Sequence, residues 1–349
     1  VLMRKNSDYY PFFTNLRFIL TAEIMYEQLL NLDPVKINFS KAGMDMINIV
    51  LAFVMYGVAL GIKPSLFKEV FKKPKSAILG AICQMVLLPA LTFLLVIILN
   101  DRITPMVAMG MLLVAACPGG NISNFMSSLS KANIELSVTL TALSTSLAPL
   151  TTPGNFALWG GLYVRYLNKQ AAGALQPLEI PISEVMITVF ILLGIPLILG
   201  LLTNKYLPKV SEKLKKPMQI FSILFFLLMV VLAFGNNLQL FLQYIWYIFF
   251  IVLIHNALAL SIGYGVGTLF KTSREDRRTL TIETGIQNSG LGLVLLFNPK
   301  IFPPDLMNGG MLFITAWWGI WHIISGLAVS AMFNYSTKRR LARAQKVDV

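Results

Sequence analysis

The sequence predicts an all-α polytopic membrane protein with nine or ten transmembrane helices, two of which are broken near their middle. Of its 349 residues, 56% are hydrophobic and only 13% are charged, whereas soluble domains carry about 25% charged residues. Apolar segments long enough to cross a bilayer as helices, which takes about 20 residues, recur along the whole chain. Two of these segments contain runs of proline, glycine and asparagine, and such runs interrupt a helix.

Nine segments have the length and hydropathy of a membrane span. They lie near residues 44–62, 76–99, 104–127, 134–164, 182–203, 218–236, 244–270, 279–298 and 308–335. Ahead of them, "FFTNLRFILTAEIMYEQLL" is interrupted by Arg17, Glu23 and Glu27. We expect an interfacial or peripheral helix there in preference to a tenth span.

The net charge of +13 is concentrated in short runs between the apolar segments. When alternate loops are assigned to one side, 20 of the 29 lysine and arginine residues, including those of the C-terminal tail, fall on that side. The positive-inside rule makes that side cytoplasmic. We therefore expect an integral membrane protein with its C-terminus in the cytoplasm, and with the lipid bilayer, and not nucleic acid, as its partner. The expected location is a bacterial inner membrane. Cys83 and Cys117 lie in apolar segments, so we expect no disulfide.

The two interrupted segments contain "CPGGNISN", residues 117–124, and "ETGIQNSG", residues 283–290. Irregular backbone at membrane depth is tolerated where protein buries it or where it lines a cavity. Matching broken helices in the two halves of a chain indicate a secondary transporter built from inverted repeats. This organisation predicts an N-terminal segment at 1–41, a first repeat at 42–170, a second repeat at 180–336 and a basic cytoplasmic tail at 337–349.

Glu283 is the acidic residue that stands out, because it lies inside a predicted span. A charge at the centre of a membrane helix costs about 2.5–3.5 kcal/mol on insertion scales, so such residues tend to be paired and functional. Gln287 follows at i+4 and would lie on the same helical face. A salt bridge with Arg277 or Arg278 near the interface is the competing explanation.

Several neutral oxygen-bearing side chains accompany this carboxylate. They are Gln84, Ser123, Asn124, Ser137 and Thr141. Hydroxyl groups in membrane helices often only bond the preceding turn or assist packing. Together with one carboxylate, however, they suit a hard cation, and a single negative charge favours a monovalent one. Sodium is the expected ion, and proton coupling through Glu283 is the alternative.

Helix breaks also expose backbone N–H groups at the start of the second half-helix, where anions bind. Asn121 and Asn288, one in each break, are placed to assist. His322 lies in the span after the second break and can line the cavity, whereas His255 is interpreted as a packing or hydrogen-bonding residue. We find no zinc spacing, phosphate-binding loop or nucleophile–base pair, so an enzyme is not expected. "GYGVG" at 263–267 is interpreted as a small-residue helix-packing surface.

At these motifs the chain resembles the bile acid:sodium symporter family over about residues 44–335. The resemblance is carried by Pro118-Gly119-Gly120 with Ser123-Asn124, by "ELSVTLTALSTSLAPLTTP", and by "TIETGIQNSGLGL". It implies ten spans, or nine where the first is missing, in a panel domain and a core domain. It also implies that the two broken helices cross in the core, with two sodium ions bound behind the crossing.

The resemblance further implies which residues form each site. For the first sodium ion they are Ser123, Asn124, Ser137, Thr141 and Glu283. For the second they are Gln84, Glu283, Gln287 and the backbone carbonyls of Thr284 and Ile286. For the substrate they are Asn121, Asn288 and His322.

The expected function is sodium-coupled symport of an organic anion by alternating access. Members of the family often carry threonine at the position of Asn121 and His-Asn where this chain has His322-Ile323. These departures favour a small monocarboxylate, with bile-acid-like anions second. Two alternatives stay open. One is a proton-coupled carrier or exchanger that titrates Glu283, and the other is a metalloid or oxyanion efflux permease of related fold that uses Cys117.

Overall fold

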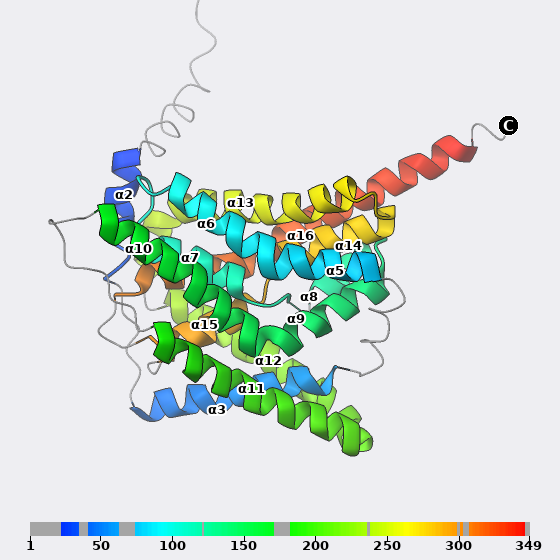
Figure 1. Ribbon diagram of the computed structural model, residues 1–349, viewed down its shortest axis with the longest axis horizontal. Coiled ribbons are helices and arrows are strands. Elements are labelled where there is room, and N and C mark those ends of the chain that lie inside the picture. The colour runs from blue at the N-terminus through cyan, green and yellow to red at the C-terminus, as the bar shows by residue number, and fades with distance from the viewer. Residues whose placement is uncertain are drawn as a thin grey trace, which may run out of the picture.

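The computed structural model describes residues 22–34, 41–62, 74–120, 122–170, 182–235, 238–298, 301–302 and 307–345. These residues are overwhelmingly helical, so the predicted all-α architecture is confirmed. Figure 1 shows the helices running side by side, with the end of α16 extending past the others. Several helices are long enough to cross a bilayer whose plane is perpendicular to their common direction.

Each of the nine predicted spans coincides with one helix or with one interrupted helix. The elements are α2 (Ala22–Leu30), α3 (Lys41–Leu60), α5 (Pro74–Ile82), the π-helical segment η1 (Cys83–Leu87), α6 (Leu88–Ile98), α7 (Pro105–Ala116), α8 (Ile122–Leu129), α9 (Ile134–Asn155), the π-helical segment η2 (Phe156–Gly160), α10 (Gly161–Gln170), α11 (Ile182–Tyr206), α12 (Pro208–Gly235), α13 (Leu238–Leu269), α14 (Arg274–Gly285), α15 (Ser289–Leu296) and α16 (Gly309–Gln345).

Four of the described helical stretches are individually long and apolar enough to cross a membrane. They are Pro74–Ile98, Val189–Tyr206, Leu242–Leu269 and Gly309–Arg340. Large apolar side chains on the outer surface, such as Ile98 and Leu269, are about three-quarters exposed. An outward apolar surface of this kind suits lipid and not water, so the protein is an integral membrane protein.

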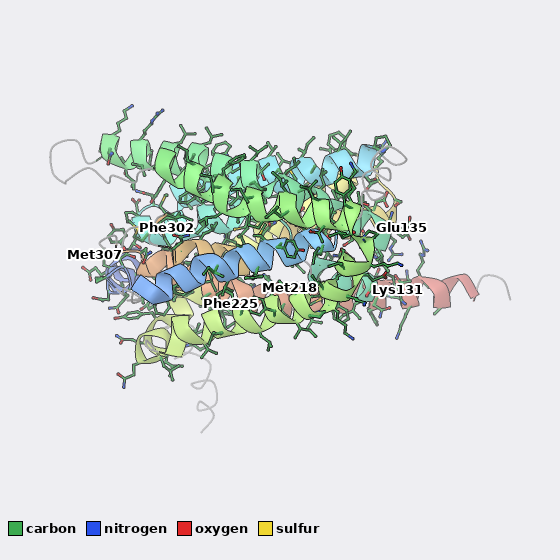
Figure 2. All side chains as sticks on the ribbon, turned by 90° about the horizontal axis from the view of Figure 1, so that it is seen from below. Lys131, Glu135, Met218, Phe225, Phe302 and Met307 are labelled. Carbon is green, nitrogen blue, oxygen red and sulfur yellow. The ribbon has the colours of Figure 1, made fainter. Side chains whose placement is uncertain are left out.

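Three helices form a panel that lies beside the rest. Figure 2 shows α3 between α11 and α12, with Met218 of α12 against α3. A Cβ at Gly57 would lie 2.7 Å from the Cβ of Met218, and one at Gly200 of α11 would lie 2.5 Å from the Cβ of Ala59. Small residues therefore let these three helices approach one another closely.

The core consists of α5–α10 and α13–α16, and its helices also meet at glycines. A Cβ at Gly263 of α13 would overlap the carbonyl oxygen of Leu280 in α14, and one at Gly267 would lie 2.8 Å from Arg277. The predicted helix-packing role of the 263–267 segment is thereby confirmed. Between α7 and α16, a Cβ at Gly110 would lie 2.7 Å from the Cα of Met311.

The N-terminal region is described only from Ala22, so most of the predicted interfacial helix over residues 12–30 lies outside the described residues. Within α2 and the turn after it, Leu29 and Leu32 are fully buried against the core. The carboxylate of Asp33 then accepts a hydrogen bond of 3.0 Å from the hydroxyl of Thr104, the N-cap of α7. The backbone carbonyl of Asp33 accepts another from the N–H of Gly309 at the start of α16.

At the end of the core away from α2, two buried charged residues of α14 form hydrogen bonds with neighbouring segments. The carboxylate of Asp276 accepts hydrogen bonds of 2.7 Å from Ser76 and from the amide of Asn133. The guanidinium of Arg278 donates to the carbonyls of Ser130 and Phe333, each at 2.7 Å. These contacts tie the loop between α8 and α9 to α5, α14 and α16.

Candidate functional site

The two helix breaks lie against each other at the centre of the core. Gly119 and Gln287 form an antiparallel β-bridge between them. The N–H of Gly120 donates to the carbonyl of Ile286 at 3.0 Å, and the N–H of Asn288 donates to the carbonyl of Pro118 at 2.8 Å. Each break thus satisfies the backbone groups that the other has released, as a membrane interior requires. The crossing of the broken helices is a feature of this fold.

A buried carboxylate lies directly behind the crossing. Glu283, near the end of α14, is 1% exposed. Its Oε1 accepts hydrogen bonds from the hydroxyls of Ser123, at 2.5 Å, and of Ser137, while its Oε2 accepts one from Thr141 at 3.1 Å. Three helices, α8, α9 and α14, therefore bring neutral hydroxyl groups to one negative charge.

Asn124 completes this first cluster. Its side-chain oxygen lies 3.0 Å from the hydroxyl of Ser137 and 3.4 Å from that of Thr141, so it shares the single proton of each hydroxyl with Glu283. The hydroxyl of Thr141 also lies 3.1 Å from the carbonyl of Ser137 one turn earlier, which is the usual acceptor for such a hydroxyl in a helix. All five residues of the first predicted ion site are brought together.

A second cluster lies on the backbone side of the same glutamate. The amide nitrogen of Gln84 donates to the carbonyl of Glu283 at 3.0 Å, and that of Gln287 donates to the carbonyl of Thr284 at 2.9 Å. Both amide oxygens are buried without a hydrogen-bond partner among the residues that the structure describes. The carbonyl of Ile286 already accepts the N–H of Gly120, as noted above, and has one lone pair left.

The predicted helical pairing of Glu283 with Gln287 is wrong in its geometry. Helix α14 ends at Gly285, and Gln287 lies in the β-bridge of the crossing. The amide of Gln287 instead reaches the carbonyl of Thr284, the residue after Glu283, and does not share an i,i+4 helical face with Glu283. The alternative of a salt bridge to arginine is also wrong. Arg278 bonds backbone carbonyls, and Arg277 donates to Thr268 and lies over the ring of Tyr264.

The chemistry of the two clusters fits a hard cation. Carboxylate, hydroxyl, amide and carbonyl oxygens are the ligand types that such ions take. The unpartnered oxygens of Gln84 and Gln287 are acceptors that lack a donor, and a buried acceptor without a partner costs free energy. A bound cation would supply both that missing partner and the counter-charge for Glu283.

Gln84 is aimed at the crossing by an irregularity in its own helix. It belongs to η1, where π-helical geometry interrupts the helix between α5 and α6; such π-bulges are frequent at functional sites. The side chain of Asn155, at the end of α9, donates to the carbonyl of Met85 in this segment at 2.9 Å. The sequence did not predict a role for Asn155, because an isolated amide near a proline belongs to no motif that marks a functional residue.

Two further residues were missed. Ser144 of α9 accepts a hydrogen bond of 3.2 Å from the N–H of Gly119 and so supports the first break. Asn256 of α13 donates to the carbonyl of Gly285 at 2.7 Å and supports the second. A polar residue in an apolar span was the available signal, but such residues are common in membrane helices.

The three residues predicted to contact substrate are not brought together by any described contact. Asn288 caps α15, because its side-chain oxygen accepts the N–H of Leu291 at 3.0 Å. Asn121 lies outside the described residues. His322 is 5% exposed on α16, and it lies between Thr315 and Gly326, which approach Gly292 and Ile286 respectively. It therefore lies on the helix face directed toward the second broken helix.

The other predicted features of the apolar spans are confirmed. His255 is fully buried, its Nε2 lies 2.8 Å from the hydroxyl of Thr92, and its ring lies 4.6 Å from that of Trp318. Both cysteines are buried and free. Packing and hydrogen bonding account for this histidine without a role at the site.

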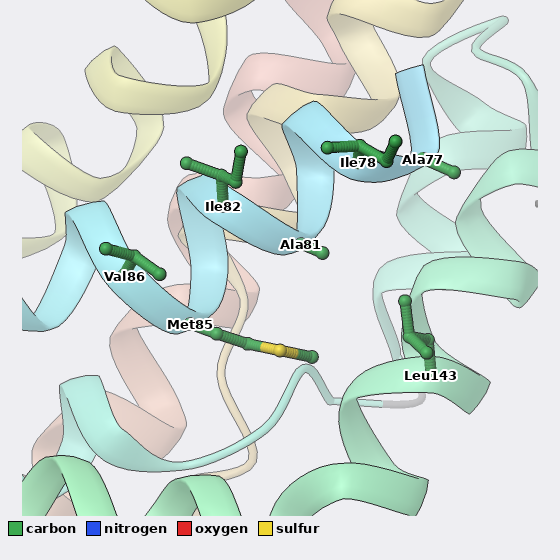
Figure 3. Close-up of a pocket in the computed structure, with 7 residues that line it drawn as sticks. All are labelled: Ala77, Ile78, Ala81, Ile82, Met85, Val86 and Leu143. Atoms are coloured by element: carbon green, nitrogen blue, oxygen red, sulfur yellow. The ribbon is translucent and has the colours of Figure 1, made fainter. Parts of the chain in front are cut away.

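A surface hollow beside η1 is apolar throughout. It is lined by Ala77, Ile78, Ala81, Ile82, Met85, Val86 and Leu143 (Figure 3). Several of these side chains are about half exposed, including Ile78 and Val86. With no polar group in its wall, this hollow offers nothing to bind a carboxylate, and it differs in character from the buried oxygen clusters.

Comparison with known proteins identifies the family to which the chain with this crossing and these oxygen clusters belongs. Residues 48–244 match the family described as the sodium bile acid symporter family. The chain belongs to this family. As a member of the sodium bile acid symporter family it is a transporter and not an enzyme.

Relatives within the family extend the match over most of the chain. The uncharacterized sodium-dependent transporter YocS of Bacillus subtilis is 30% identical over 308 residues, which are 87% of this chain and 87% of that protein. The probable sodium/metabolite cotransporter BASS2 of rice chloroplasts is 26% identical over 76% of this chain and 60% of its own length. Human sodium/bile acid cotransporter 4 is 30% identical over 75% of this chain and 57% of its own length.

Proposed function

We propose that this protein is a sodium-coupled symporter that carries a small organic anion into the cell by alternating access. The observation that carries the proposal is that two clusters of buried oxygens share one carboxylate, Glu283, directly behind the crossing. Two of the relatives are named "sodium-dependent transporter" and "sodium/metabolite cotransporter", and these names agree with sodium as the coupling ion.

Each cluster would hold one sodium ion. The first site would be formed by Ser123, Asn124, Ser137, Thr141 and Glu283. The second would be formed by Gln84, Gln287, Glu283 and the carbonyls of Thr284 and Ile286. Bound ions supply counter-charge for Glu283 and steady the crossing, while this chain's hydroxyls and amides fix where each ion lies. Two sodium ions with one monoanion would carry net positive charge across the membrane.

The substrate would bind on the other side of the crossing, at the half-helix ends. Helix α15 begins there, capped by Asn288, and exposed N–H groups at such an end attract a carboxylate. Asn121 and His322 are proposed to complete the site. These few polar groups suit a small monocarboxylate better than a bulky bile-acid-like anion.

Transport would require the core to move against the panel. The panel helices α3, α11 and α12 pack mainly on one another, whereas the crossing is held entirely within the core. Neutralising the buried charge of Glu283 by sodium would lower the cost of moving the loaded core. We further propose that residues 42–170 and 180–336 are the two inverted repeats, and that the protein lies in a bacterial inner membrane with its C-terminus in the cytoplasm.

The deciding experiment is thermal unfolding of the purified protein in sodium against potassium or choline chloride. A ligand that binds only the folded state stabilises it by RT ln(1 + [L]/Kd), about 2.7 kcal/mol at 100 times Kd. We expect a sodium-specific rise in Tm for the wild type that is lost in Glu283→Gln. The matched control is Glu135→Gln, at the exposed start of α9, which should keep the rise.

The outcomes separate the alternatives. A wild type that responds to pH but to no concentration of sodium would make Glu283 a proton site and overturn sodium symport. Uptake of labelled small monocarboxylates into proteoliposomes, with and without a sodium gradient, then identifies the substrate. Cys117→Ala should transport at the wild-type rate. Loss of transport in that variant would instead favour the permease that uses a thiol.

A further inference from the structure

Three side-chain amides cap three successive carbonyls at the end of α14. Gln84 donates to the carbonyl of Glu283, Gln287 to that of Thr284, and Asn256 of α13 to that of Gly285 at 2.7 Å. Carbonyls in the last turn of a helix lack partners within the helix. At membrane depth these partners must come from the protein, and here amides provide all three.

The orientation of each amide follows from its partner. A backbone carbonyl can only accept a hydrogen bond, so the nitrogen must face it and the oxygen must point away. The side-chain oxygen of Asn256, like those of Gln84 and Gln287, is buried without a hydrogen-bond partner in the described part of the chain. Asn256 is 1% exposed. Two of these three amides already belong to the proposed second sodium site, and the third has the same arrangement.

Asn256 acts on the peptide unit between two proposed ligands. The carbonyls of Thr284 and Ile286 flank that of Gly285 along the chain, and Gly285 has no side chain to restrict its backbone. A Cβ at Gly285 would overlap Leu260 of α13, so α13 lies directly against this turn. Since α14 ends here, the hydrogen bond from Asn256 ties the irregular backbone to a continuous helix.

We propose that Asn256 is a positioning residue of the second sodium site. It fixes the Gly285 peptide so that the carbonyls of Thr284 and Ile286 are presented to the ion. This inference rests on the proposed function, because it concerns the affinity of the same site. Groups that orient metal ligands from outside the coordination shell typically change metal affinity by about 10- to 100-fold when they are removed.

The test uses two variants at this position and one control. Asn256→Leu keeps the branched shape of the side chain but removes the donor. Asn256→Thr keeps a polar side chain, whose hydroxyl would bond its own helix, as those of Thr281 and Thr284 do. The matched control is Asn204→Leu. Asn204, near the end of α11, also donates to a carbonyl of another segment, that of Ile62 at 2.6 Å.

The measurement is the sodium concentration that gives half of the maximal rise in Tm, together with Tm in sodium-free buffer. Both Asn256 variants should need about 10-fold more sodium and should still reach a rise at saturation. Asn204→Leu should lower Tm with an unchanged sodium midpoint. In transport, the variants should regain the wild-type maximal rate at high sodium.

An unchanged sodium midpoint in both Asn256 variants, with Tm lowered equally with and without sodium, would make the residue structural only and overturn the inference. That result differs from failure of the proposed function, in which the wild type itself would show no response to sodium. If Asn256→Leu does not fold, Asn256→Thr alone decides between these results.

Discussion

The backbone N–H of Asn288 lies 2.8 Å from the carbonyl oxygen of Pro118, so the second helix break is bonded directly to the first. The proline in one break provides the free acceptor, and the asparagine in the other provides the free donor. Because both hydrogen bonds of the crossing join residues from different halves of the chain, each break is held in part by the other. The oxygen clusters depend on this geometry, since Gln287 and the end of α14 lie within it.

Crowding the crossing should abolish the response to sodium. In Gly119→Ala the new Cβ would overlap the amide nitrogen of Gln84 and lie 3.3 Å from the carboxylate of Glu283. We expect Gln84 to be displaced and the sodium-dependent rise in Tm to be lost. Gly154→Ala is the control, because a Cβ there meets no atom within 4 Å and alanine favours a helix by about 1 kcal/mol. A full sodium response in Gly119→Ala would show that Gln84 is dispensable.

Two threonines of α9 should behave differently although both are buried. Thr141 contacts Glu283, whereas the hydroxyl of Thr139 donates to the carbonyl of Glu135 at 2.7 Å in its own helix. Thr141→Val should raise the sodium concentration for half-maximal transport by at least about 10-fold. Thr139→Val should leave it unchanged. Equal effects of the two substitutions, measured by uptake at graded sodium concentrations, would contradict the first ion site.

The contact between α13 and α14 should tolerate no side chain at Gly263. The Cβ of an alanine at this position would overlap the backbone carbonyl of Leu280, and a backbone group cannot move aside as a side chain can. Gly263→Ala should therefore lower the free energy of unfolding by about 1–3 kcal/mol, as overpacking does. Gly265→Ala should not lower it, because a Cβ at Gly265 meets no atom within 4 Å. Thermal unfolding of both variants in sodium-free buffer tests this difference.

Stability should depend on pH through Asp33, in the turn after α2 and outside the spanning helices. Burial raises the pKa of this carboxyl to about 7, against hydrogen bonds from Thr104 and the backbone of Gly310 that lower it. The charge of Asp33 in turn acts electrostatically on the phenols of Tyr26 and Tyr163, which are neutral in this range.

The sign of this effect follows from proton binding. Between about pH 4 and pH 7 the folded state holds a proton on Asp33 that the unfolded state has lost, so stability falls as pH rises through this window. Asp33→Asn cannot titrate and should lose less stability than the wild type between pH 5 and pH 8. Parallel Tm curves for the two proteins across that range would rule out the contribution of Asp33.

The sequence by itself determined the membrane class, the nine spans and the two breaks. These features are local: hydropathy over about 20 residues makes a span, and proline, glycine and asparagine interrupt it wherever it packs. Glu283 could be singled out for the same reason, since a carboxylate inside an apolar segment is costly without reference to its neighbours. The residues of the first ion site followed from their oxygens and from the family resemblance.

Only the tertiary structure decided which polar atoms meet. Gln84 and Glu283 are 199 residues apart, and their contact depends on how η1, α14 and the crossing pack together. The roles of Asn155 and Asn256 are likewise invisible in the sequence, because each donates to a carbonyl of another helix, in a π-helical segment or beside a break. A helix break can be recognised from the local sequence. Tertiary packing, however, determines which residue bonds the backbone groups that the break frees.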